Sequence, residues 1–158
     1  MRVFKFGGAS VKDAEAVKNV ALILSKFNKE DLVVIVSAMG KTTNALEKIV
    51  DAYYNGDKNT RELIDAVRNF HSEIIDDLGF NKKHPLRAEV ENSFVEIDWL
   101  IEEELSKGYA FAYDQITSHG ELMATRIVSG YLNENNIQNE WLDIRDVLQT
   151  DNTYREGK

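Results

Sequence analysis

Three residues near the start of the chain have the chemistry of an anion site. Lys5 is followed closely by Gly7 and Gly8, and Ser10 comes just before an apolar helical pattern. Lysine supplies a compact positive charge, adjacent glycines let the backbone approach a ligand, and N–H groups at a helix start favour a negative ligand. Lys5, Gly7 and Gly8 form a candidate phosphate site. A tight strand-to-helix turn with a solvated lysine is the simpler alternative.

A second polar segment, from Ser37 to Asn44, combines small residues with hydroxyl groups that can donate hydrogen bonds. Its simpler interpretation is a turn in which Thr42 or Thr43 caps the following helix. The sequence Gly-Lys-Thr within it is not a P-loop, because the first glycine of that motif would fall at Ile35.

The third candidate is Glu121, which small and apolar residues flank within a predicted helix. A carboxylate packed against a sheet is costly unless it has a cationic partner. Glu121 is therefore a candidate ligand for a positively charged group. An exposed glutamate paired with Arg126 is an equally good explanation of the pattern.

The elements that must position these residues follow from the spacing of apolar side chains. A strand up to Phe6, a helix that Ser10 caps and that ends near Asn28, and a strand from Asp31 to Val36 are expected. The second strand lacks alternation, which is typical of a strand buried on both faces of a parallel sheet. Because ligands bind at the carboxyl ends of such strands, the first two polar segments should converge there.

The rest of the chain is predicted to be mainly helical, with residues 82–85 as a connection and a further strand at 139–143. Two helices should form an antiparallel hairpin outside the sheet. Asp114 is placed to cap the last long helix. The apolar stripes of the four helices run from Leu46 to Tyr53, from Leu63 to Leu78 before Gly79, from Val90 to Leu105, and from Ile116 to Leu132.

The composition excludes several classes of protein. The 158 residues carry a net charge of −8 without a basic cluster, so no nucleic-acid or anionic-membrane surface is expected. The chain has no cysteine, no apolar run long enough for a signal peptide or a membrane span, and three scattered histidines that form no metal motif. A single soluble, cytoplasmic domain is the expectation.

Four separated segments resemble the aspartate kinases. Lys5 to Ser10 is similar to the amino-terminal KFGG signature of that family, with Ala9 as a departure, and Ser37-Ala38 followed by Thr43-Asn44 matches a second segment. Gly120 to Ala124 resembles the family's Gly-Glu-Leu-Met-Ser segment with alanine in place of serine, and Asp143 to Arg145 resembles its Asp-x-Arg segment.

The resemblance implies an α/β fold, a three-layer α/β/α sandwich with a mostly parallel sheet, of which residues 1–158 are the amino-terminal, substrate-side portion. It implies transfer of the γ-phosphoryl group of ATP, with Mg²⁺ carried on the phosphates and no tightly bound cofactor, to the side chain of L-aspartate. The implied catalytic lysine is Lys5 and no residue is an implied metal ligand. The implied phosphate contacts are Lys5, Phe6, Gly7, Gly8 and Ser37, and the implied aspartate contacts are Ser37, Ala38, Thr43 and Glu121.

The family's nucleotide-binding half and regulatory domains have no counterpart in the sequence, so the chain alone is expected to be inactive, and its open sheet edges suggest a homo-oligomer. Two alternatives remain. One is another kinase of the same fold that acts on glutamate, acetylglutamate or carbamate. The other is a non-catalytic interaction domain.

Overall fold

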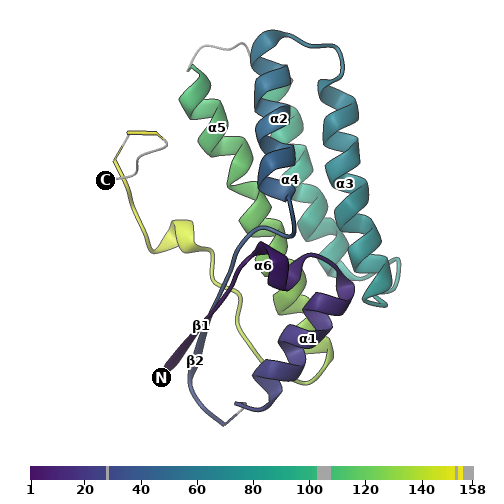
Figure 1. Ribbon diagram of the computed structural model, residues 1–158, viewed down its shortest axis with the longest axis vertical. Helices are drawn as coiled ribbons and strands as arrows, with labels where there is room; N and C mark the ends of the chain where they lie inside the picture. Colours follow the sequence, from purple (N-terminus) through teal and green to yellow (C-terminus); the bar gives the residue numbers. More distant parts are fainter. Residues whose placement is uncertain (28, 103–107, 152, 155–158) are drawn as a thin grey trace.

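The computed structural model describes residues 1–27, 29–102, 108–151 and 153–154. Its sheet consists of two parallel strands, β1 (Arg2–Phe6) and β2 (Leu32–Val36), in which Lys5 is paired with Ile35. Helix α1 (Ala14–Ser25) connects them, as Figure 1 shows. The predicted strand, helix, strand unit is thus confirmed, and both strands end at the same edge of the sheet.

The start of α1 differs from the prediction. A short 3₁₀ turn (Gly8–Val11) follows β1, and the cap of α1 is Asp13, whose carboxylate accepts a hydrogen bond from Ala16 N at 2.8 Å. The prediction that Ser10 caps the helix was wrong, because the turn uses three additional residues before the chain enters the α-helix. The predicted end near Asn28 lies outside the described residues, and α1 itself ends at Ser25.

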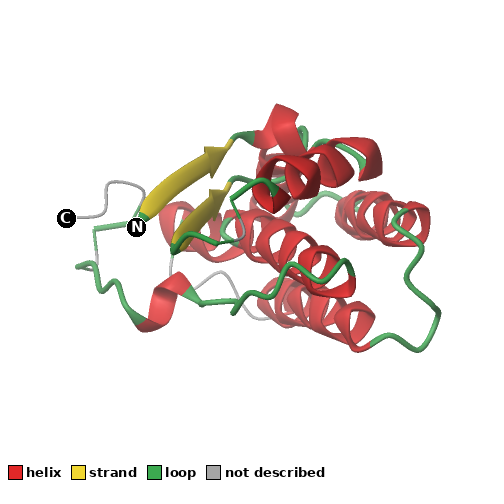
Figure 2. Ribbon diagram, turned by 90° about the horizontal axis from the view of Figure 1, so that it is seen from below, coloured by secondary structure: helices red, strands yellow, loops and turns green. Residues whose placement is uncertain are grey.

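The sheet buries only one of its faces within the described residues. Side chains alternate along both strands, so that Phe6 and Val36 are buried whereas Val33 and Ile35 are 42% and 49% exposed. Helix α6 (His119–Glu134) contacts β2 on the buried side and also contacts α1. The prediction that β2 is buried on both faces was therefore wrong for this chain, since described helices cover one face alone (Figure 2).

A bundle of helices stands beyond the carboxyl ends of the strands in Figure 1. Contacts join α2 (Thr42–Asn55) to α3 (Thr60–Asp77) and α5 (Tyr109–Thr117). Helix α4 (Pro85–Glu102) contacts α3, α5 and α6, so the predicted hairpin of two long helices, α3 and α4, is confirmed. The connection predicted at 82–85 runs from Leu78 to His84, because α3 ends at Asp77 and Pro85 occupies the first position of α4, where its missing N–H costs nothing.

Two predictions about the last third of the chain were wrong. Asp114 lies inside α5 and therefore caps no helix, because α5 and α6 follow each other with only Ser118 between them. Residues 139–143 form no strand and lie along α6, where Asn139 bonds to the side chains of Ser129 and Asn133, before a 3₁₀ turn (Ile144–Asp146). The predicted end of the third helix at Leu105 lies outside the described residues.

Two histidines are buried. His71 packs between Phe70 and Phe94 in the bundle, with Nδ1 2.8 Å from the carbonyl oxygen of Val67 and Nε2 without a partner. Burial lowers the pKa of His71 below its ordinary value, against a smaller opposing effect of that backbone hydrogen bond. Burial also lowers the pKa of His119, whose Nε2 is 3.6 Å from Glu96. The expectation of structural or surface histidines thus holds for both.

The stability of the chain is expected to decrease as the pH falls below about 6.5, the ordinary histidine pKa. Above that pH, histidine is neutral in both the folded and the unfolded chain. Below it, histidine in the unfolded chain binds a proton, whereas a buried imidazole stays neutral, so protonation favours unfolding. Each buried histidine should contribute a slope of up to about 1.4 kcal/mol per pH unit to the free energy of unfolding. Urea unfolding between about pH 5 and pH 7 measures this slope, which His71→Gln should reduce. An unchanged slope in that variant would contradict the assignment.

Among the residues that the structure describes, no helix has both the length and the apolar character needed to cross a bilayer.

Candidate functional site

The loops that follow β1 and β2 are bonded to each other at the edge of the sheet. Ser37 N donates to the carbonyl oxygen of Phe6 at 3.0 Å, and Gly40 N donates to that of Gly8 at 3.0 Å. A Cβ atom at Gly8 would lie 2.7 Å from the oxygen of Ala38 and 2.9 Å from that of Gly40. Only glycine fits at this position, and the predicted convergence of the two loops is confirmed.

Helix α6 adds a third segment to this edge. The Glu121 carboxylate accepts a hydrogen bond from Ala38 N at 3.4 Å, directly after the end of β2. The neighbouring Gly120 makes the approach possible, since a Cβ atom there would lie 3.0 Å from Ala38 Cβ and 3.2 Å from a methyl group of Leu46. Glu121 is half-buried and aimed at the loop. Its carboxylate is therefore held in place while part of it stays open to a ligand.

Glu121 does not pair with Arg126, which was the alternative explanation. Arg126 instead forms an ion pair with Glu89 at 3.1 Å, and its guanidinium lies over the ring of Trp141, 3.7 Å from the centroid. No cation among the described residues neutralises Glu121. A positive charge supplied by a ligand would fill that role.

Lys5 lies at the same edge but on the other face of the sheet. Its neighbours in β1, Phe4 and Phe6, face the helices, so the Lys5 side chain faces the open side together with Ile35. Lys5 is exposed and has no ion-pair partner among the described residues. The structure thus brings the end of β1, which carries Lys5, and the start of α6, which carries Glu121, to one edge of the sheet without a contact between the two charged side chains.

Of three hydroxyl groups in the second loop, one forms a hydrogen bond within the protein and two have no partner among the described residues. Thr42 is buried and donates to the carbonyl oxygen of Met39 at 2.7 Å, which closes the turn before α2. It does not cap α2, so the capping interpretation was wrong. Ser37 and Thr43 are half-buried, and neither hydroxyl has a partner among the described residues. Both are available to a ligand at this edge.

The predicted phosphate turn has an open approach at Gly7. Its φ of −76° and ψ of 169° are extended, and a Cβ atom there would meet no atom within 4 Å. The first N–H groups of the helical turn after it have no partner within that turn. The backbone at Gly7 and Gly8 is therefore accessible on its outer side and packed on its inner side.

Sequence reasoning missed Thr125 and Trp141. The hydroxyl of Thr125 donates to the backbone oxygen of Glu121 at 2.9 Å and accepts a hydrogen bond from the indole N–H of Trp141 at 2.9 Å. The four-residue spacing from Glu121 to Thr125 was visible in the sequence, whereas the contact with Trp141 was not. These two hydrogen bonds connect the first turn of α6, which carries Glu121, to the segment after that helix.

The segment at Asp143 contributes an ion pair. Arg145 donates to both carboxylate oxygens of Asp143, and these hydrogen bonds lower the pKa of Asp143. The pair is local to its turn and contacts none of the residues predicted for the phosphate. Within the described part of the chain, no group of three or more histidine or acidic side chains is arranged to hold a metal ion.

Comparisons with known proteins agree with this geometry. The profile of the amino acid kinase family matches residues 1–157. Lysine-sensitive aspartokinase 3 of Escherichia coli is 32% identical over 153 residues, 96% of this chain and 33% of the relative. Chloroplastic aspartokinase 2 of Arabidopsis thaliana is 37% identical over 143 residues, 84% of this chain and 24% of the relative.

A solved structure of E. coli aspartokinase III in complex with aspartate and ADP superimposes with a TM-score of 0.86 at 30% identity, over 100% of this chain and 34% of that one. This likeness confirms the predicted α/β fold class, of which the two strands and their helices are a part. The chain spans about a quarter to a third of the length of these relatives. From the family profile and the shared fold, the chain belongs to the amino acid kinase family.

Proposed function

We propose that this chain is the amino-terminal, substrate-side part of an aspartate kinase, which transfers the γ-phosphoryl group of ATP to the side-chain carboxylate of L-aspartate. The observation that carries the proposal is the hydrogen bond from Ala38 N to Glu121. It joins an unneutralised carboxylate to the edge where the loops of Lys5 and Ser37 meet. In the proposal, the aspartate site and the phosphate site lie next to each other at this edge.

In this proposal each group has a separate task. Glu121 binds the α-ammonium group of aspartate, and the hydroxyl groups of Ser37 and Thr43, with the backbone at Ala38, position its side-chain carboxylate. The backbone at Phe6, Gly7 and Gly8 and the ammonium of Lys5 bind the phosphates, which carry Mg²⁺. Phosphoryl transfer needs positioned donors around dispersed negative charge and little covalent help from the protein.

The arrangement favours aspartate over the alternatives. A carboxylate such as Glu121 rejects acceptors that lack a free ammonium group, which include acetylglutamate and carbamate. Glutamate retains the ammonium but is one methylene longer. Calorimetric titration of the full-length kinase with aspartate and with glutamate tests the proposal; tighter binding of glutamate, or binding of neither, would refute it. The 158-residue chain alone is expected not to form aspartyl phosphate from ATP.

We propose that the protein is located in the cytoplasm, with which the absence of cysteine is compatible. We also propose that it forms a homo-oligomer. The exposed apolar side chains of the open sheet face, including Val3, Val33 and Ile35, support self-association.

Glu121→Gln in the full-length kinase is expected to raise the KM for aspartate by roughly tenfold to a hundredfold, because a charge-assisted hydrogen bond is lost. The KM for ATP should change much less. Steady-state kinetics with both substrates measure the two values. Glu73→Gln, an exposed position of α3 with no described partner, is the matched control. Equal effects of Glu121→Gln on both KM values would contradict the role of this carboxylate.

A further inference from the structure

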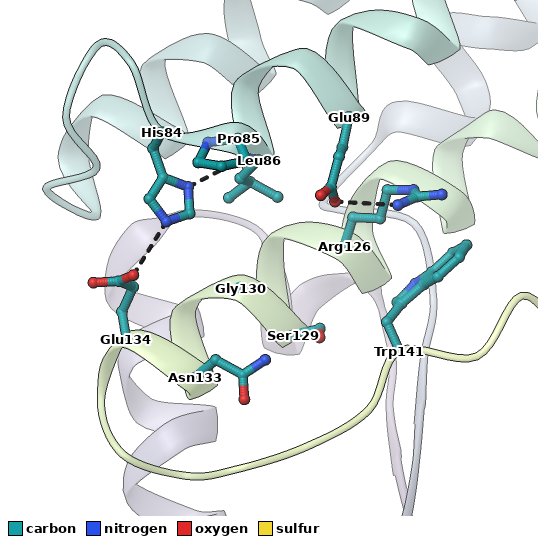
Figure 3. Close-up of a pocket in the computed structure, with 10 residues that line it drawn as sticks. All are labelled: His84, Pro85, Leu86, Glu89, Arg126, Ser129, Gly130, Asn133, Glu134 and Trp141. Carbon is teal, nitrogen blue, oxygen red and sulfur yellow. Dashed lines mark hydrogen bonds and ion pairs between the residues drawn. The ribbon is translucent and has the colours of Figure 1, made fainter.

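A pocket of about 290 Å³ lies between α4, α6 and the segment at Trp141 (Figure 3). The start of α4, the second half of α6 and the segment at Trp141 enclose it. None of the residues that the aspartate kinase proposal uses lines it. Trp141, which lines the pocket, is nevertheless connected to that site through Thr125, which bonds to the backbone of Glu121.

The floor of the pocket is apolar. Pro85 and Leu86 come from the first turn of α4, and Gly130 of α6 lies beneath them. A Cβ atom at Gly130 would lie 3.1 Å from a methyl group of Leu86, so the two helices are in close contact there. A hydrocarbon body placed on this floor would be removed from water on one side.

One end of the pocket holds a cation that is already compensated. The Arg126 guanidinium is paired with Glu89 at 3.1 Å and stacks on Trp141 at 3.7 Å, as Figure 3 shows for the ion pair. The indole N–H of Trp141 also has a partner, because it donates a hydrogen bond to the hydroxyl of Thr125. This end therefore offers an aromatic ring and little uncompensated positive charge.

The other end holds a carboxylate that is only partly used. One oxygen of Glu134 is 3.1 Å from His84 Nε2. Because His84 Nδ1 accepts a hydrogen bond from Leu86 N at 3.2 Å, the ring proton is on Nε2, and a neutral histidine suffices to donate it. The side chain of Glu134 is 59% exposed, and its second oxygen has no partner among the described residues. Figure 3 places Glu134 and Trp141 on opposite sides of the floor.

We propose that this pocket binds a small primary amine. Its ammonium group would donate to Glu134, and its apolar body would lie over Leu86 and Pro85 toward Trp141. The two carboxylates of the pocket outnumber its one guanidinium in a chain of net charge −8, which favours a cation and disfavours an anion. The volume equals roughly ten water molecules, so the ligand has about ten non-hydrogen atoms or fewer.

Three ligands with the same hexyl chain distinguish the contribution of the head-group charge to binding from that of apolar burial. They are hexylamine, 1-hexanol and hexanoate. The fluorescence of Trp141 reports binding to the 158-residue chain after Trp99→Phe removes the other tryptophan, which is 65% exposed on α4. Hexylamine is expected to bind about tenfold more tightly than 1-hexanol, equivalent to one charge-assisted hydrogen bond, and hexanoate more weakly than either. The advantage of hexylamine should shrink as salt is added.

Glu134→Gln should remove the advantage of hexylamine over 1-hexanol, while Glu62→Gln, an exposed position of α3 outside the pocket, should keep it. Circular dichroism confirms that both variants fold. Equal binding of the amine and the alcohol to the parent chain, tighter binding of hexanoate, no binding of hexylamine at millimolar concentration, or an unchanged preference in Glu134→Gln would each overturn the proposal.

Discussion

Lys5→Ala in the full-length kinase is expected to lower kcat by about a hundredfold or more if the proposed function holds, because the proposal assigns Lys5 one preorganised charge at the transferred phosphoryl group. Lys5 is exposed on the open face of the sheet, two residues before the accessible backbone at Gly7. It has no ion pair among the described residues, so its removal breaks no described contact. The loss should therefore appear in the rate and leave the stability nearly unchanged.

The measurement is ATP-dependent formation of aspartyl phosphate, with thermal unfolding of the same samples. Lys48→Ala is the matched control, because Lys48 is exposed on α2 and alanine suits a helix. A rate within a few-fold of the parent for Lys5→Ala would refute the catalytic role and favour a non-catalytic domain. A large loss of stability would instead give Lys5 a structural role that the described contacts do not show.

Gly8→Ala is expected to destabilise the chain by roughly 2 to 4 kcal/mol, in the range of overpacked or strained sites. The new Cβ atom would lie 2.7 Å and 2.9 Å from two backbone oxygens, those of Ala38 and Gly40. Neither oxygen can rotate away like the end of a side chain. The loop after β2 must move, and the hydrogen bond from Gly40 N to Gly8 at 3.0 Å moves with it.

Gly7→Ala is the matched control for this effect. A Cβ atom at Gly7 would meet no atom within 4 Å, and its φ of −76° suits any residue, so its stability should change by less than about 0.5 kcal/mol. Urea unfolding of the 158-residue chain measures both variants. Equal stabilities of Gly7→Ala and Gly8→Ala would show that the two loops are not packed as described. A Gly7→Ala chain that is stable while its full-length kinase binds ATP weakly would locate the phosphate at the open side of this turn.

Local patterns predicted the helices well and the sheet environment poorly. The apolar residues from Leu63 to Leu78 identified α3, because their three- and four-residue spacing over this length fits the period of an α-helix. The sequence of β2 predicted burial on both faces, yet Val33 and Ile35 are exposed, since burial depends on what covers a face. The strand predicted at 139–143 failed for a similar reason: Asn139 and Trp141 bond to α6 and keep the segment out of the sheet.

For the candidate site too, the sequence predicted some of the arrangement and tertiary packing decided the rest. Order along the chain was enough to place Lys5, Gly8 and Ser37 at one sheet edge, because parallel strands joined by a helix end at the same side. Sequence could not decide whether Glu121 faces that edge or pairs with Arg126, because residues 83 positions apart meet only after α6 has packed. The contact of Gly120 with Ala38 decided it. Helical and strand periods are local properties of the chain, whereas the partner of a half-buried carboxylate is chosen by packing between distant segments.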